Sequence, residues 1–220
     1  MRKRRSKVKG YHTRQSLARR KPFLAPRARV LIVCEGGKTE PIYFKALRKD
    51  RRLTATEVEV HGAGCDPSAL IQFAVDHIDK KKNEEGQVNK NPYDRVWCVF
   101  DCDAHERLAE AINRAKDLGF KIAFSNPCFE LWYILHFDYS SAPCTSKQAV
   151  SLLRKKHIPE YTKAKNVYEH LLKLQDTAIQ NAQSLRRHHE TSSPARRVGL
   201  IVRNPSTSVD RLVAYLNGLG

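Results

Sequence analysis

Two short apolar runs that each end in acidic residues constrain the fold of this chain most strongly. The first covers residues 29–34 (RVLIVC) and is followed by Glu35; the second covers residues 96–100 (VWCVF) and is followed by Asp101 and Asp103. Both runs are rich in β-branched or aromatic residues and precede helical patterns, which is typical of buried parallel strands. Because open α/β sheets bind ligands at the carboxyl ends of their strands, these acidic side chains lie where a site is expected.

These carboxylates have the chemistry of a divalent-cation site. On an extended chain Asp101 and Asp103 share one face, about 6.6 Å apart, and Glu35 faces them from another strand. Two carboxylates about 4 Å apart repel by roughly 4 kcal/mol at an effective dielectric constant of about 20. That repulsion favours a bound Mg²⁺ or Mn²⁺, both of which suit carboxylate oxygens. The alternative is that Glu35 or Asp101 only caps the helix after its strand.

Strands and helices alternate along the first two thirds of the chain. Periodicity predicts strands at 57–61 and 121–124, and helices at 40–49 with Thr39 as its cap, at about 67–82, and around the stripe Leu108, Ile112, Ala115 and Leu118. Such alternation requires right-handed crossovers and a parallel sheet covered on both faces. The fold class is therefore α/β.

The last part of the chain reads as mostly helical. Residues 128–137 form an apolar helix that contains Glu130, an expensive place for a carboxylate unless something pairs with it. Glu130 therefore either joins the candidate site or pairs with a Lys or Arg as a structural strut. Further patterns predict a long amphipathic helix at about 161–185, a strand at 198–202 and a last helix that ends near Asn217.

Four motifs together resemble the RloB family. They are residues 33–44 (VCEGGKTEPIYF), 100–103 (FDCD), 125–132 (SNPCFELW) and 204–207 (NPST). A strand-end Glu followed by a later Asp-x-Asp is similar to the Toprim domain of topoisomerases and primases, and RloB proteins are a Toprim-like group. The resemblance covers about residues 29–217. It implies a Toprim-like Rossmannoid sheet with helices on both faces in a core at about 29–137, and a helical elaboration at about 138–217.

The resemblance also implies an activity and a setting. RloB proteins are encoded beside restriction loci or paired with an ATPase in abortive-infection systems. We therefore expect a Mg²⁺- or Mn²⁺-dependent nuclease that cleaves RNA, such as tRNA, or DNA, in antiviral defence under the control of a partner ATPase. The expected metal ligands are Glu35, Asp101 and Asp103, and the expected catalytic residues are Glu35, Glu40, Lys38 and Glu130. The alternative is a non-catalytic subunit that binds nucleic acid or an ATPase and holds a structural metal.

Positive charge is concentrated at the N-terminus. The formal net charge is +17, and residues 1–29 hold twelve Lys and Arg and no acidic residue. Without periodic apolar residues, residues 1–28 are predicted to be a disordered arm. The arm either binds nucleic acid, docks an acidic partner or is only a solvated leader. The expected nucleic-acid contacts are Arg2, Lys3, Arg4, Arg5, Arg186, Arg187 and Arg203.

Cysteine spacing and hydropathy indicate the cellular compartment of the protein. None of the six cysteines forms a C-x-x-C pair, and Cys34 and Cys98 lie within predicted buried strands, which argues against structural zinc or a disulfide framework. No apolar stretch approaches the roughly eighteen residues that a membrane span needs. We expect a cytoplasmic protein with no membrane partner.

Overall fold

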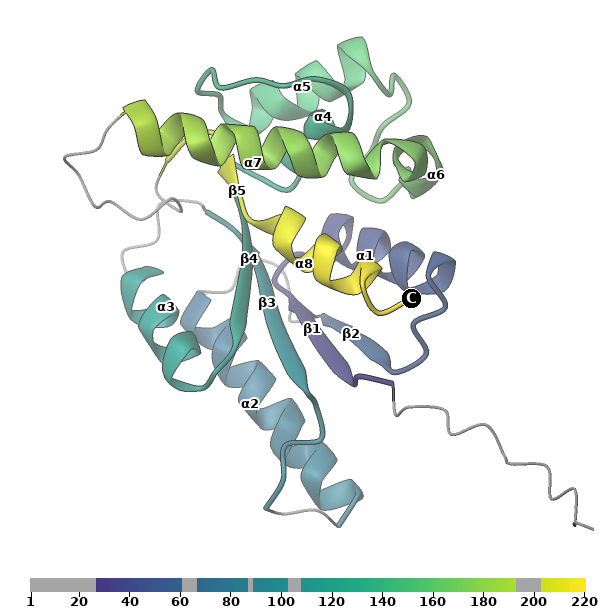
Figure 1. Ribbon diagram of the computed structural model, residues 1–220, viewed down its shortest axis with the longest axis vertical. Coiled ribbons are helices and arrows are strands. Elements are labelled where there is room, and N and C mark those ends of the chain that lie inside the picture. The colour runs from purple at the N-terminus through teal and green to yellow at the C-terminus, as the bar shows by residue number, and fades with distance from the viewer. Residues whose placement is uncertain (1–26, 61–66, 87–88, 103–107, 193–202) are drawn as a thin grey trace, which may run out of the picture.

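A five-stranded sheet forms the centre of the protein (Figure 1). The computed structural model describes residues 27–60, 67–86, 89–102, 108–192 and 203–220. The strands are β1 (Val30–Cys34), β2 (Thr56–Val60), β3 (Arg95–Asp101), β4 (Lys121–Asn126) and β5 (Ser206–Thr207), in the order β2-β1-β3-β4-β5. The first four strands are parallel, which confirms the predicted α/β sheet, whereas the two-residue β5 runs antiparallel to β4. The strand predicted at 198–202 lies outside the described residues.

Helices cover both faces of the sheet, and this explains why its strands are apolar throughout. In β1, Val30, Ile32 and Cys34 face one core, whereas Leu31 and Val33 face the other, and all five are fully buried. The first core is covered by α1 (Thr39–Asp50) and α8 (Val209–Asn217), and the second by α2 (Pro67–Glu84) and α3 (Leu108–Asp117). The predicted helices at 40–49 and 67–82 and the predicted last helix are confirmed.

A further group of helices lies beyond the carboxyl ends of the parallel strands (Figure 1). It consists of α4 (Glu130–Phe137), α5 (Ser146–Lys156), α6 (Tyr168–Leu171), a 3₁₀ turn at Leu172–Leu174 and α7 (Gln175–Ser192). The central helix, α4, packs against both α5 and α7 and is buried from Glu130 to His136. A helix that is apolar on all sides, such as this one, belongs in a core.

One helical prediction in this region needs correction, and one helix was not predicted. The predicted helix at 161–185 is wrong at its start, because Asn166 accepts a hydrogen bond from the Tyr168 backbone amide and turns the chain before α6. Its second half is correct, since α7 buries Ala178, Ala182 and Leu185 as the pattern predicted. The helix α5 was not predicted at all, although it begins with a capping box between Thr145 and Gln148.

Smaller details of the fold bear on the sequence predictions. Thr39 is the first residue of α1 rather than its cap; Lys38 occupies the cap position without a side-chain hydrogen bond. His136 is a core histidine whose Nδ1 lies 2.8 Å from the Trp132 carbonyl oxygen, and burial lowers its pKa to about 4.

Within the described residues, no helix has both the length and the apolar character that crossing a bilayer requires.

Candidate functional site

A pocket of about 240 Å³ lies at the carboxyl ends of β1 and β3. We call it the acidic pocket; its lining residues are Gly36, Gly37, Lys38, Thr39, Glu40, Asp101, Phe129, Glu130 and Lys163. Four separate segments meet here: the β1–α1 loop with the start of α1, the end of β3, the start of α4, and the loop between α5 and α6. The pocket thus joins the sheet edge that the sequence singled out to the helical group beyond it.

The sheet register places Glu35 and Asp101 side by side. Cys34 pairs with Val99, and the Glu35 backbone amide then donates a 2.9 Å hydrogen bond to the Val99 carbonyl oxygen. Asp101 ends β3 next to Ser125 of β4. Glu35 and Asp101 therefore lie at the same edge of the sheet, whereas Asp103, the third predicted metal ligand, lies outside the described residues.

Glu40 is buried because the β1–α1 turn contains glycine. A Cβ atom at Gly36 would overlap the Glu40 carboxylate, so a larger residue there would displace it. Glu40 is only 5% exposed in the first turn of α1. Burial raises the pKa of Glu40, and nearby Glu130 adds to the rise, whereas backbone amides of Glu40 and Gly36 and the charge of Lys163 oppose it.

Glu130 is held in place by a tyrosine from the helical group. It is 1% exposed at the start of α4, and its Oε1 accepts a 2.7 Å hydrogen bond from the Tyr161 hydroxyl. The sequence left open whether Glu130 joins the site or pairs with a cation as a strut. It lines the pocket and accepts this hydrogen bond from a neutral hydroxyl group rather than from a Lys or Arg.

Asp101 carries the least compensated charge in the pocket. Its Oδ1 is inaccessible to solvent and has no hydrogen-bond partner among the described residues. Burial raises the pKa of Asp101 well above its usual range, and the charges of Glu40, Glu130 and Glu35 raise it further. Lys163 is the cation that opposes them. A buried carboxylate surrounded by other carboxylates and short of donors is suited to accept a cation.

A second acidic group lies on the α2 face of the sheet edge. Glu57 and Glu59 of β2 and His77 of α2 each offer one ligand atom, and these atoms lie within 4.8 Å of one another. We call this group the Glu57 cluster. Within the part of the chain that the structure describes, the pocket carboxylates do not gather as closely as this. By spacing alone, the Glu57 cluster is therefore also able to hold a metal.

The charge of Glu57 is already compensated. The Tyr93 hydroxyl donates a 2.6 Å hydrogen bond to Glu57 Oε2, and Lys81 Nζ lies 3.6 Å from the other carboxylate oxygen. Burial on its own would raise the pKa of Glu57, but Tyr93, Lys81 and His77 outweigh it and lower the pKa. Sequence analysis assigned no role to these residues, which it described only as a short alternating strand and part of a helix.

The predicted nucleic-acid contacts are scattered in the structure. Arg186 lies on α7, where its guanidinium makes two 2.7 Å hydrogen bonds to the buried Asp210 of α8. Arg186 was expected to contact nucleic acid from an exposed position. It instead pairs with Asp210, because α7 continues to Ser192 and places the Arg186 side chain against α8. Arg187 is exposed and Arg203 is half-buried. Arg2, Lys3, Arg4 and Arg5 lie outside the described residues.

Sequence reasoning missed two residues of the pocket, Tyr161 and Lys163. Both fall in the segment predicted to be the beginning of a long helix, where their side chains had no assigned partner. Their position depends on contacts with residues far away in the chain: Tyr161 with Glu130, and the Lys163 carbonyl oxygen with the Thr39 hydroxyl at 3.4 Å. A local sequence pattern does not predict such long-range contacts.

Comparison with known proteins identifies one family. A family model described as RloB-like protein matches residues 30–216, from the first residue of β1 to the last turn of α8. No curated protein and no solved structure matches the chain. The match spans most of the sequence and includes all the segments that form the acidic pocket. The chain therefore belongs to the RloB-like family.

Proposed function

We propose that this protein is a metal-dependent nuclease whose centre is the acidic pocket. One observation carries the proposal: Asp101 Oδ1 is buried without a hydrogen-bond partner among the described residues, beside three other carboxylates that raise its pKa. An isolated structural carboxylate in such a place would be expected to have a donor, since an unpaired buried polar group is costly. A divalent cation would supply the missing positive charge.

The candidate residues would have three roles. Asp101, Glu35 and Asp103 would hold Mg²⁺ or Mn²⁺, with Glu40 and Glu130 available for a second ion. Such an ion would activate water and stabilise charge on the phosphate. Glu35, whose charge acts on Asp101 from the end of β1, would accept a proton from the attacking water, and Lys38, exposed on the pocket wall, would offset the negative charge of the phosphate.

We further propose that the activity is controlled by a partner. Electrostatic attraction gives a basic nuclease affinity for all nucleic acid without sequence discrimination. A cytoplasmic enzyme of this kind would damage its own cell unless restrained. The family setting favours a partner ATPase and a role in antiviral defence, with RNA such as tRNA, or DNA, as substrate. The basic residues of the N-terminal arm remain predicted contacts for that substrate.

A second candidate function follows from the Glu57 cluster. Its three ligand atoms are spaced for a metal, which favours a non-catalytic subunit that binds nucleic acid or an ATPase and uses a metal for structure. In that case metal would raise the melting temperature through the Glu57 cluster and no cleavage would accompany it.

The test separates the two candidates. The full chain, alone and co-expressed with its neighbouring gene product, is incubated with plasmid DNA and total RNA in Mg²⁺ or Mn²⁺. Cleavage that Asp101→Asn removes and Glu59→Gln/His77→Gln retains supports the nuclease. Absence of cleavage under every condition, together with metal stabilisation that only Glu59→Gln/His77→Gln abolishes, would contradict it and support the structural site.

A further inference from the structure

A basic groove runs along the exposed side of α5. It has a volume of about 480 Å³ and is lined by Lys147, Arg154, Lys155 and Lys163, together with the hydroxyl-bearing Ser146 and Ser151. No acidic side chain is among its lining residues in the described part of the chain. All four cationic side chains are exposed. The groove is therefore a concave surface that offers only positive charges and hydroxyl groups as polar side chains.

The helical period of α5 explains this arrangement. Lys147, Ser151 and Lys155 are four residues apart, so they lie on one face of the helix. Ala149 and Leu153 are buried on the opposite side, in the core shared with α4. From Lys147 to Lys155 the helix rises about 12 Å, at about 1.5 Å per residue. Three to four nucleotides of one strand span a similar length, at about 3.4 Å each.

The basic groove leads into the acidic pocket. Lys163 lines both, so the two share a wall. The loop that carries Lys163 is fixed from both sides: Arg154 Nε donates a 2.9 Å hydrogen bond to the Tyr161 carbonyl oxygen, and the Tyr161 hydroxyl donates to Glu130. The loop thus holds one cation at the junction between the buried carboxylates and the exposed basic face.

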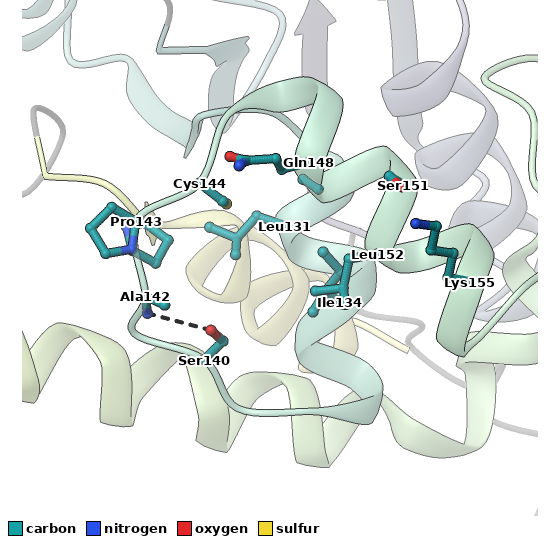
Figure 2. A pocket seen from close by; sticks show the side chains of 12 residues that line it. Leu131, Ile134, Ser140, Ala142, Pro143, Cys144, Gln148, Ser151, Leu152 and Lys155 are labelled. Carbon is teal, nitrogen blue, oxygen red and sulfur yellow. Dashed lines mark hydrogen bonds between the residues drawn. The ribbon is translucent and has the colours of Figure 1, made fainter.

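The groove also adjoins an apolar pocket of about 390 Å³. The two share Ser151 and Lys155. Figure 2 shows Ser151 and Lys155 at one end of that pocket and Ala142 and Pro143 at the other. Lys155 therefore lines both the basic groove and the apolar pocket, and it does not line the acidic pocket.

We infer that the basic groove binds the backbone of a single-stranded nucleic acid and guides it to the acidic pocket. The inference rests on the proposed nuclease function and names the surface that such a substrate would use. A pocket lined by three carboxylates repels phosphate, so a substrate needs cations next to it, and the groove provides them. Glu40 and Glu130 are 5% and 1% exposed, so a phosphodiester must enter the pocket to meet them, which a single strand does more readily than a duplex.

The experiment measures binding of the full chain in EDTA, where no cleavage occurs. Fluorescence anisotropy with labelled 20-nucleotide oligo(U) and oligo(dT), and with a 20-base-pair duplex, is recorded at several salt concentrations. The groove variant is Lys147→Gln/Lys155→Gln. The matched control, Lys116→Gln/Lys121→Gln, removes the same charge from two exposed lysines at the end of α3 and the start of β4, far from α5 (Figure 1).

The groove variant is expected to bind single strands less tightly than wild type, and the control variant to bind as wild type. Each lost phosphate contact flattens the log–log salt slope by about 0.7, so two contacts remove about 1.4, which is about 25-fold in affinity at 0.1 M salt relative to a 1 M reference. Equal loss in both variants, no loss in either, or a larger loss on the duplex than on single strands would each overturn the inference.

A failure of the groove inference can be distinguished from a failure of the proposed nuclease function. Loss of binding in the groove variant with no cleavage in any metal would support the groove and contradict the nuclease. Cleavage by a groove variant that binds like wild type would do the reverse. Circular dichroism and the melting temperature verify that each variant is folded, which is expected because all four substituted lysines are exposed.

Discussion

The acidic pocket and the Glu57 cluster use the same kind of side chain for different ends. In the Glu57 cluster a tyrosine hydroxyl and a lysine satisfy the carboxylate, and the pKa of Glu57 is lowered. In the acidic pocket burial and neighbouring carboxylates raise the pKa of Asp101, and its buried Oδ1 has no hydrogen-bond partner among the described residues. The close spacing of its ligand atoms favours the Glu57 cluster as a metal site, whereas its uncompensated charge favours the acidic pocket.

This difference shows why distance between ligand atoms is an incomplete guide to a metal site. Carboxylates that have cationic and hydroxyl partners stabilise the fold by themselves. Carboxylates that raise one another's pKa destabilise it unless a cation is present, so their retention in one pocket needs a functional reason.

The largest expected effect is on catalysis. Asp101→Asn should slow cleavage by about 10³-fold or more, because a bound ion contributes several kcal/mol of charge stabilisation and each 1.36 kcal/mol is a factor of ten. Glu59→Gln/His77→Gln should stay within about twofold of wild type. Initial rates on labelled RNA or plasmid in Mg²⁺ provide the measurement. The reverse pattern would place the metal in the Glu57 cluster.

The next effect is on stability without metal. The pKa of Asp101 is raised in the folded protein, so its contribution to stability is present at low pH and is lost as the pH rises through the folded pKa. In EDTA at pH 7.5, Asp101→Asn should therefore melt at a higher temperature than wild type, by about 2–4 °C for each kcal/mol gained. The advantage should disappear near pH 4. A lower melting temperature at pH 7.5 would show that Asp101 is compensated after all.

A smaller change of opposite sign is expected in the Glu57 cluster. The pKa of Glu57 is lowered, so its contribution is present above its unfolded pKa and is lost as the pH falls through the folded pKa. Glu57→Gln should lower the melting temperature at pH 7.5 by about 1–3 °C, since a partly exposed ion pair contributes about 1 kcal/mol or less. The difference should fade toward pH 3. Differential scanning calorimetry of both variants in one buffer series compares the two signs directly.

The smallest expected effect concerns the cation in the acidic pocket. Lys163 opposes the pKa rise of Asp101 and Glu40, so it competes with a divalent ion for the same negative charge. Lys163→Gln should tighten Mn²⁺ binding by about two- to fivefold, as expected for an exposed charge. Lys165→Gln is the matched control, because Lys165 pairs with Glu160 and does not line the pocket. Calorimetric titration with Mn²⁺ alone gives both affinities; equal values would remove Lys163 from the site.

The sequence predicted the part of the site at the sheet edge better than the part that the helical group contributes. The strands that end at Cys34 and Asp101 were identified because buried parallel strands are continuous apolar runs. Glu40 and Glu130 were named as candidates, and the structure places both at the pocket. The helix α5 was missed, although its Thr145–Gln148 capping box is a local signal that could have revealed it.

The alternation of the first four strands with helices along the chain and the acidic residues that follow the strands are local properties, and the sequence alone determined them. Hydrophobic period and turn chemistry act over a few residues and can be read directly. Which carboxylates are compensated was decided only by the tertiary structure. The residues that lie near these carboxylates are far from them in the sequence: Tyr161 and Lys163 in the acidic pocket, and Tyr93 and Lys81 in the Glu57 cluster. The desolvation that contributes to each pKa shift exists only after the core has formed.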